Sequence, residues 1–225
     1  MSALFVAGAG TDVGKTHVTA GLIRALRARG AAVSALKPLV SGFDPDDWAH
    51  SDPGRLLQAL GQALTPEALQ ALSPWRYRAP LSPDMAAARE GHSVDYDGIV
   101  SLCREKIAAA GEASLLIEGV GGAMSPLSAT TTNLDWMAAL GVPVLLVTGS
   151  YLGSISHALT AAAVIRGVGL ALAGIAVSES AGAETPFEET VASLERLSEA
   201  RLFVVRRDQA AEAWAPAILD GVPGR

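Results

Sequence analysis

The sequence has a single cysteine, Cys103, so its 225 residues cannot form an internal disulfide bond. Disulfide frameworks belong to oxidising compartments, and a chain without one fits a reducing cytosol. Cys103 lies in the segment 96–110, whose periodicity predicts an amphipathic helix, and we expect it to pack there rather than act in catalysis. The expected location of the protein is therefore the cytoplasm.

An excess of basic residues is also missing. The 17 lysines and arginines are outnumbered by 23 aspartates and glutamates, which gives a net charge of −6. Domains that bind nucleic acids usually carry a basic patch that attracts phosphates. We therefore expect no nucleic acid among the partners of this chain.

Long uninterrupted apolar runs are lacking as well. The best candidate for a membrane span, residues 157–177, contains Arg166 and three glycines, which predicts a buried helix followed by a buried strand. Residues 1–8 have neither the basic nor the apolar region of a secretory signal. We therefore expect neither a membrane span nor a signal peptide.

Short apolar runs alternate with segments of helical periodicity along the chain. The runs that we interpret as strands are 3–8, 32–38, 114–119, 143–149, 170–177 and 201–205. The segments that we interpret as helices lie near 15–29, 96–110, 133–140, 154–167 and 186–198. This alternation predicts an α/β fold with a mostly parallel central sheet flanked by helices, built as a single domain over residues 1–225.

The segment 40–94 interrupts this alternation. It contains six prolines and two predicted short helices, near 52–62 and 66–72. Ligands of open α/β sheets bind beyond the carboxyl ends of the strands, so a long insertion after a strand favours a substrate-binding role. A surface excursion without a functional role is the alternative.

Glycines and small polar residues connect the first predicted strand to the first predicted helix. The segment "GAGTDVGKT", residues 8–16, has the strand–loop–helix context of a phosphate-binding loop. Backbone N–H groups at such a corner point into one cavity, and the helix dipole adds positive potential. Gly14 would let a phosphate approach closely, Lys15 would reach the β- and γ-phosphates, and Thr16 would offer its hydroxyl to Mg²⁺.

The match to the strict phosphate-loop pattern is imperfect at one position. The pattern has a glycine five residues before Gly14, where this chain has Ala9, and Gly8 supplies the glycine instead. A glycine-rich turn with an incidental lysine is the alternative. The agreement of strand, G-K-T and helix favours nucleotide binding.

A carboxylate lies near the end of the predicted strand 114–119. Glu118 would be costly in a buried strand if it were unpaired, so a metal or a nucleotide explains it better than packing does. Gly119, Gly121 and Gly122 would let the chain pass close to a ligand. Asp52 could be a further acidic ligand for Mg²⁺, although N-capping is the usual role of an S-D pair before a helix.

Several ordered motifs resemble those of the dethiobiotin synthetase family. They are "GAGTDVGKT" (8–16), "LKPLVSG" (36–42), "HSD" (50–52), "SPWRYRAPLSPDMAA" (73–87), "IEGVGGAMSPL" (117–127) and "LGSISHALTA" (152–161). Their order and spacing are more specific than any one motif. The resemblance implies a three-layer P-loop NTPase fold and a cyclo-ligase of biotin biosynthesis that forms C–N bonds.

In that family, 7,8-diaminononanoate (diaminopelargonic acid), CO₂ and ATP give dethiobiotin, ADP and phosphate. A carbamate forms first and receives the γ-phosphate of ATP. The neighbouring amine then attacks this mixed anhydride, closes the ring and expels phosphate. Catalysis of this kind consists of positioning and of neutralising the developing negative charge.

The resemblance implies catalytic roles for Lys37, Lys15 and Thr11. The two lysines would hold the γ-phosphate between the carbamate and ADP. Thr11 and Ser41 would bind the carbamate or diamine end of the substrate. Without the resemblance, Lys37 is equally well explained as a surface lysine at the end of a strand.

The resemblance also implies one set of nucleotide and metal contacts. Thr16, Asp52 and Glu118 would ligate Mg²⁺. The residues expected beside ATP are Asp12, Val13, Gly14, Lys15, Thr16, His17, Asp52, Glu118, Gly119, Val120, Gly121, Ser178 and Glu179.

The start of the predicted helix 154–167 is a second anion site in the family. Gly153, Ser154, Ile155 and Ser156 would bind the distal carboxylate of the substrate through free N–H groups, across the interface of a homodimer. His157 would lie in that interface or cap the helix. From the residues alone, an ordinary capped helix is the alternative.

Two departures from the family concern the nucleotide base. Ser178 and Glu179 stand where the family usually has asparagine and aspartate against adenine, and a serine has fewer hydrogen-bonding groups than an amide. The segment "RLFVVRRDQAAEAW" (201–214) lacks the glycine–proline pattern that packs near the base. The sequence therefore leaves the preferred base open.

Two other functions use a related loop. A P-loop switch ATPase often has a lysine four residues before the second loop glycine, where this chain has Gly10. An amide-forming synthetase acting on a cobalamin precursor would need a catalytic cysteine in a second domain, which Cys103 alone does not provide. Both are less favoured than the dethiobiotin synthetase function.

Overall fold

A computed structural model describes residues 3–182 and 184–222 of the chain. Its central sheet has six parallel strands in the order β2-β5-β1-β6-β7-β8. Their bounds are β1 Ala3–Gly8, β2 Val33–Leu36, β5 Ser114–Glu118, β6 Val144–Thr148, β7 Leu172–Ser178 and β8 Leu202–Val205. A second, smaller sheet pairs β3 (Leu39–Ser41) with β4 (Trp75–Tyr77), also in parallel.

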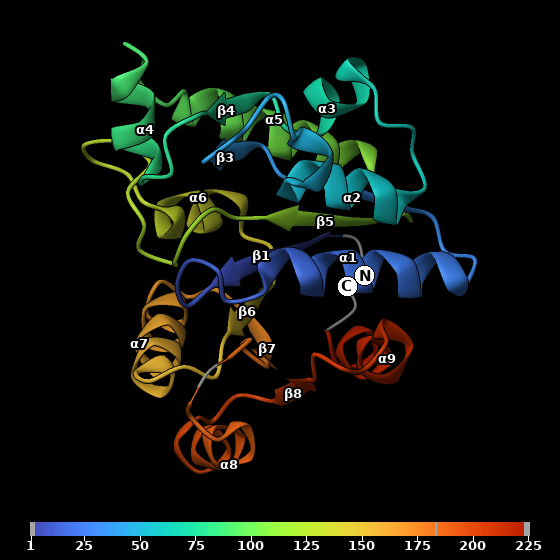
Figure 1. Cartoon of the computed structure of the whole chain (residues 1–225), viewed down its shortest axis with the longest axis vertical. Coiled ribbons are helices and arrows are strands. Elements are labelled where there is room, and N and C mark those ends of the chain that lie inside the picture. The colour runs from blue at the N-terminus through green and yellow to red at the C-terminus, as the bar shows by residue number, and fades with distance from the viewer. Residues whose placement is uncertain (1–2, 183, 223–225) are drawn as a thin grey trace.

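Helices cover both faces of the central sheet (Figure 1). The helices of one face are α1 (Lys15–Ala28), α2 (Asp52–Leu60), α3 (Pro66–Leu72) and α9 (Ala211–Gly221). Those of the other face are α5 (Tyr96–Ala109), α6 (Asn133–Leu140), α7 (Ser154–Gly167) and α8 (Phe187–Leu197). The result is the three-layer α/β architecture expected from the sequence.

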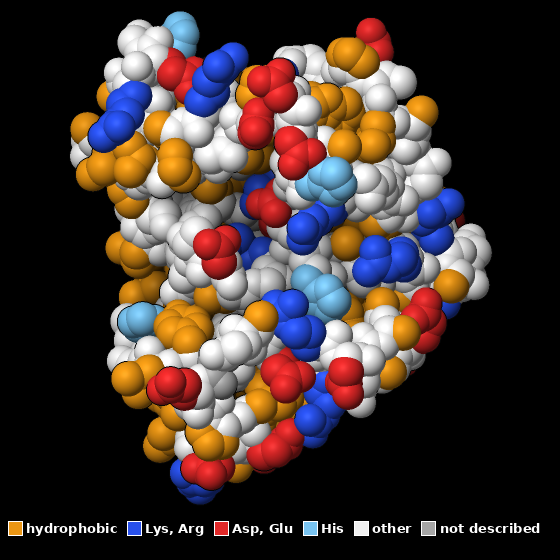
Figure 2. Space-filling model, viewed as in Figure 1, with side chains coloured by type: hydrophobic (Ala, Val, Ile, Leu, Met, Phe, Trp, Pro, Cys, Tyr) orange, Lys and Arg blue, Asp and Glu red, His pale blue; other side chains and the backbone are white. Residues whose placement is uncertain are grey.

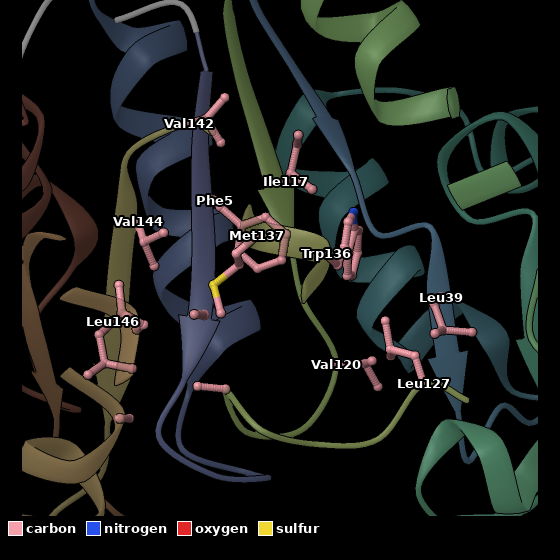
Figure 3. Packing of buried hydrophobic residues seen from close by; sticks show 14 of the residues in the cluster. Phe5, Leu39, Ile117, Val120, Leu127, Trp136, Met137, Val142, Val144 and Leu146 are labelled. Atoms are coloured by element: carbon pink, nitrogen blue, oxygen red, sulfur yellow. The ribbon is translucent and has the colours of Figure 1, made fainter. Parts of the chain in front are cut away.

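The strands contribute to two apolar cores, one on each face of the sheet. In β1, Phe5 faces the core of α5–α8, while Leu4 and Val6 face the core of α1 and α9. Phe5 meets Trp136 of α6 edge-on, with ring centroids 4.9 Å apart and planes at 87° (Figure 3). Burial on both faces explains why the strand segments are apolar throughout rather than alternating.

The only cysteine, Cys103, is fully buried in α5 within the core of α5–α8. Burial raises the pKa of its thiol to about 12, so the nucleophilic thiolate is strongly disfavoured near neutral pH. This placement agrees with the expectation that Cys103 packs rather than reacts.

The predicted central strands and helices end within two residues of the observed bounds. The sequence did not predict β3, β4, α4 (Pro83–Arg89) or α9. The two strands have only three residues each and exist through their mutual pairing, and α9 contains Pro216, which is unusual inside a helix. The segment 40–94 therefore holds more regular structure than expected.

The most apolar stretch of the sequence, residues 157–177, forms most of α7 and most of β7. Arg166 is exposed near the end of α7. Within the described parts of the chain, no helix is long and apolar enough to cross a membrane.

Helices α1 and α9 approach each other closely at Gly21. A Cβ atom at this position would lie 2.2 Å from Cη2 of Trp214 and 3.2 Å from Cβ of Ala211. Trp214 is itself buried in the core of this face. The lack of a side chain at Gly21 therefore sets how near the two helices can lie.

We expect Gly21→Ala to lower the free energy of unfolding by about 1–3 kcal/mol, because the methyl group overpacks against the indole. Gly167→Ala is the matched control, since nothing lies within 4 Å of a Cβ added there. This control should be neutral or stabilising, by up to about 1 kcal/mol. Urea unfolding followed by circular dichroism measures both, and equal stabilities of Gly21→Ala and the control would contradict the close approach.

Candidate functional site

The loop between β1 and α1 is shaped around positions that cannot hold a side chain. At Gly8, a Cβ atom would lie 2.6 Å from the carbonyl oxygen of Gly10 and 2.7 Å from that of Gly121. This crowding explains why glycine stands at position 8. Asp12 has a φ of 56°, the one positive φ outside glycine among the described residues, and such strain is typical of loops that hold ligands.

Helix α1 begins at Lys15 with uncapped backbone amides. Its N-cap residue, Gly14, has a φ of 94°, and no side chain caps the helix. A helix start of this kind attracts anions through its N–H groups and its dipole. The Lys15 ammonium donates to the Gly10 carbonyl oxygen at 3.0 Å. Burial, together with repulsion from Lys37, lowers the pKa of Lys15 to about 8.

A buried cluster lies beside the loop, centred on Glu118 at the end of β5. The Oε1 atom of Glu118 accepts from the Thr16 hydroxyl at 2.6 Å and from the Lys37 ammonium at 2.8 Å. Lys37 also donates to the Gly119 carbonyl oxygen at 2.8 Å and lies 3.3 Å from Oδ2 of Asp52. The side chains of Lys37 and Glu118 are 2% and 0% exposed, so their charges depend on these contacts instead of on water.

Opposite charges shift the pKa values of Lys37 and Asp52 in favour of their charged forms. Burial alone would lower the pKa of Lys37, but the Glu118 and Asp52 carboxylates outweigh it and raise this pKa above its usual value. Burial likewise opposes the charge of Asp52, yet Lys37 and the Thr16 hydroxyl bring the pKa of Asp52 below its usual value. Lys37 and Asp52 are therefore both charged at neutral pH.

The Asp52 side chain is free for this role because another residue caps α2. Ser51 is the N-cap of the helix, and its hydroxyl accepts from the backbone N–H of Gly54 at 3.4 Å. Asp52 is the first residue of the helix and faces Lys37. The alternative that Asp52 is only an N-cap is therefore wrong.

Glu118 has one oxygen without a protein partner. Its Oε2 atom is buried and accepts no hydrogen bond from the described residues, and such atoms are rare in protein interiors. With the Thr16 hydroxyl and the Asp52 carboxylate, it offers the hard oxygen ligands that Mg²⁺ prefers. Among the described side chains, no group of three or more His, Cys, Asp or Glu residues is placed to hold a metal ion by itself.

Two cavities meet above this cluster, and Figure 2 shows a hollow on this face with acidic, basic and histidine side chains around it. The first cavity, of about 690 Å³, has Thr11, Lys37 and Ser41 in its wall. The second, of about 590 Å³, is bordered by the start of α1 and the end of β7. The residues that border both cavities are Asp12, Lys15, Asp52 and Arg55.

Comparisons with known proteins show which family the chain belongs to. A family model described as an AAA domain matches residues 2–205. The ATP-dependent dethiobiotin synthetase BioD of Methylobacterium nodulans is 52% identical over 92% of this chain and 94% of its own length. Those of Phenylobacterium zucineum and Caulobacter vibrioides are 46% and 56% identical, over 100% and 80% of this chain and 97% and 81% of their own.

The chain belongs to the dethiobiotin synthetase family. It is therefore an ATP-dependent ligase with a P-loop NTPase fold. Among solved structures, the signal recognition particle receptor FtsY of Elizabethkingia anophelis and the chloroplast FtsY of Physcomitrella patens both match with a TM-score of 0.52. They are 14% and 17% identical, and the match covers 97% of this chain and 64% of each of theirs, so it shows the fold alone.

Most residues that the dethiobiotin synthetase resemblance placed beside ATP come together. Those that border the second cavity are Asp12, Gly14, Lys15, Thr16, His17, Asp52 and Ser178. Val120 and Gly121 border the first cavity, and Val13 is buried beneath the loop. Glu179 borders neither cavity, because its carboxylate accepts the backbone N–H of Arg207 at 3.0 Å.

The residues expected to form a second anion site, 153–156, lie at the start of α7. Gly153 is the N-cap with a φ of 95°, and no side chain caps the helix, so its first amides are uncapped. Ser154 is buried, and its hydroxyl oxygen has no partner among the described residues. Ile155 is half-buried and Ser156 is exposed. None of these residues borders the two cavities above the Glu118 cluster.

His157 does not cap α7. Its Nδ1 atom pairs with the Tyr151 hydroxyl at 2.9 Å, and the two rings lie 5.7 Å apart. His157 also borders a third cavity, of about 410 Å³, which has Thr11 and Met124 in its wall. This placement leaves an interface role as the remaining expectation for His157.

Four residues of the second cavity were missed from the sequence: Arg55, Ser180, Ala181 and Arg207. Ser180 exchanges two hydrogen bonds of 3.0 Å with Ser150, each hydroxyl accepting the backbone N–H of the other residue. Ser180 and Arg207 follow β7 and β8 at the carboxyl edge of the sheet, and this position could have marked them as candidate site residues. Arg55 lies one helical turn after Asp52, and that spacing could have marked it.

We expect Glu118→Gln to lower the free energy of unfolding by about 3–5 kcal/mol, because it leaves the buried Lys37 ammonium without its nearest counter-charge. Adding Lys37→Met removes both buried charges and should recover most of that loss. Urea unfolding of the single and double variants measures this. A double variant less stable than Glu118→Gln alone would contradict the dependence of one charge on the other.

Proposed function

We propose that this chain catalyses the ATP-dependent carboxylation and ring closure of 7,8-diaminononanoate with CO₂, which yields dethiobiotin, ADP and phosphate. The observation that carries the proposal is the Lys37 ammonium, which is buried against Glu118 yet lies in the wall of the first cavity, beside the phosphate loop. A buried cation facing a cavity is suited to stabilise an anion that forms there.

The two cavities would divide the substrates between them. ATP would occupy the second cavity, with its phosphates on the amides of the loop and of the start of α1. The diamine and CO₂ would occupy the first cavity, where the hydroxyls of Thr11 and Ser41 can donate to the carbamate. The γ-phosphate would then lie at the shared boundary, within reach of Lys15.

The reaction would proceed in three steps. One amine adds to CO₂ and loses a proton, which gives a carbamate anion. A carbamate oxygen then bonds to the γ-phosphorus while the bond from this phosphorus to the β–γ bridging oxygen breaks, and ADP leaves with that electron pair. The second amine attacks the carbonyl carbon, loses a proton, and expels phosphate to close the cyclic urea. The two ammonium groups would neutralise the negative charge of the transferred phosphoryl group.

Mg²⁺ held by Thr16, Asp52 and Glu118 would offset the charge of the triphosphate. This chain's own residues would provide the rest of the catalysis by positioning. Lys37 would keep the carbamate and the γ-phosphate in line, and Thr11 would fix the orientation of the carbamate. The base would lie beside Ser178, where one hydroxyl gives limited hydrogen bonding, so its identity stays open.

We also propose that the enzyme is a cytoplasmic homodimer in which residues 153–156 of one subunit bind the distal carboxylate of the substrate held by the other. Large apolar side chains near the start of α7 support an interface. Leu152 is 91% exposed and Met124 is 54% exposed, and exposed apolar residues of this size are typical of interaction surfaces when they cluster.

Incubation of the purified protein with 7,8-diaminononanoate, bicarbonate, Mg²⁺ and each of a panel of nucleoside triphosphates tests the reaction. We expect a cyclic urea, detected by mass spectrometry, together with release of phosphate that requires the diamine. Nucleotide hydrolysis that ignores the diamine, with no cyclic urea, would rule the proposed reaction out.

Replacement of Lys37 by alanine should lower kcat about 10²–10³-fold, because it removes a buried positive charge from the developing phosphoryl transfer. Lys106→Ala is the control, since Lys106 is on the partly exposed surface of α5 and should leave turnover unchanged. Steady-state kinetics on both variants, with circular dichroism to verify folding, measure the effect. Wild-type turnover in a folded Lys37→Ala variant would remove Lys37 from the site.

A further inference from the structure

Four residues border both cavities, and one of them, Arg55, has no part in the mechanism described above. Asp12 and Lys15 belong to the phosphate loop, and Asp52 lies beside Lys37. Arg55 follows Asp52 by three residues in α2, so the two side chains share a face of the helix. This boundary is where the γ-phosphate of ATP is proposed to lie.

The guanidinium of Arg55 has free donors. Its Nε atom donates to the His50 carbonyl oxygen at 3.1 Å, which orients the group. Within the described residues, Arg55 forms no ion pair, and its Nη groups donate no hydrogen bond. A planar fork with unused N–H donors suits the oxygens of a phosphoryl group, to which it can donate two parallel hydrogen bonds.

The two lysines of the site, in contrast, already donate hydrogen bonds to acceptors of the protein. The Lys37 ammonium has three acceptors around it, the carboxylates of Glu118 and Asp52 and the carbonyl oxygen of Gly119, one for each of its N–H donors. Lys15 already donates to the loop backbone. Lys37 must therefore exchange a partner before it donates to a phosphate oxygen, whereas Lys15, with two further N–H donors, and Arg55 need not.

The charges at the boundary between the two cavities also favour a further cation there. The ammonium groups of Lys15 and Lys37 interact with three carboxylates, those of Asp12, Asp52 and Glu118. Without Arg55, the side chains here provide three carboxylates against two ammonium groups, so Arg55 would add to the positive charge of the proposed Mg²⁺ where the γ-phosphate arrives. The charge of Arg55 reaches the loop: burial lowers the pKa of His17, and Arg24, Arg207 and Arg55 lower it further.

We propose that Arg55 donates to the γ-phosphoryl oxygens of bound ATP and stabilises that group during its transfer to the carbamate. The proposal rests on the proposed function for the transfer step. As the bond to the β–γ bridging oxygen breaks and the carbamate oxygen bonds to phosphorus, negative charge stays on the three other oxygens of the phosphoryl group.

Nucleotide affinity tests the contact without the diamine. Mg²⁺–ADP and Mg²⁺–AMP-PNP, whose γ-phosphate is not hydrolysed, are titrated into the wild type, Arg55→Ala and Arg55→Lys by calorimetry. We expect Arg55→Ala to weaken AMP-PNP binding about tenfold or more and to leave ADP binding unchanged, with Arg55→Lys intermediate. No loss for AMP-PNP, or an equal loss for both nucleotides, would overturn the proposal.

A matched control separates contact from general charge. Arg24 of α1 also lowers the pKa of His17 but borders neither cavity, so Arg24→Ala should bind both nucleotides like the wild type. If Arg24→Ala and Arg55→Ala lose AMP-PNP affinity equally, the effect comes from the long-range electrostatic field, and the proposal of a direct contact by Arg55 is wrong.

Turnover provides the second readout. In the ring-closure assay, kcat of Arg55→Ala should fall about 10²-fold, and added guanidinium ion should restore part of it. A fall in kcat that guanidinium does not relieve, with unchanged AMP-PNP affinity, would overturn the assignment. If the wild type makes no cyclic urea while the AMP-PNP difference persists, the proposed function fails and the phosphoryl contact stands.

Discussion

The carboxylate of Glu118 is shielded from water at the end of β5, and several elements of the site meet there. Its Oε1 atom accepts from Thr16, in the first turn of α1, and from Lys37, which directly follows β2. Because β5 lies between β1 and β2 in parallel register, the carboxyl ends of the three strands converge on this atom. A buried carboxylate that lost both donors would be costly, so the loop and the end of the second strand depend on each other for their positions.

The segment 40–94 completes the site on one side of this cluster. β3 continues from Lys37 almost at once and pairs with β4, and the Gly42 N–H donates to the Ala79 carbonyl oxygen at 2.9 Å. This pairing brings residues 80–83 into the wall of the first cavity opposite the loop. Helix α2 carries Asp52 and Arg55 to the same boundary. The sheet thus supplies the buried charges, and the segment 40–94 closes the space in which they act.

The central sheet and the loop could be predicted because the residue pattern of each segment directly reflects its place in the fold. Strands buried on both faces are apolar throughout, and Gly8 and Gly14 lie where crowding excludes side chains. The pairing of β3 with β4 could not be predicted, because each strand is too short to have a pattern of its own. Arg55 was missed for another reason: an exposed arginine on a helix is ordinary, its spacing from Asp52 is a weak signal, and its place where two cavities meet is visible only in the structure.

Gly14 and Ser178 are in close contact, since a Cβ atom on Gly14 would lie 2.5 Å from the Ser178 hydroxyl oxygen. Gly14 caps the helix whose amides face the phosphate site, and Ser178 is the last residue of β7 in the same cavity. A larger side chain at position 178 would therefore need a rotamer that points away from Gly14, or a shift of the loop. Under the proposed function, a substitution at position 178 would therefore affect the fit of the phosphates as well as the contacts to the base.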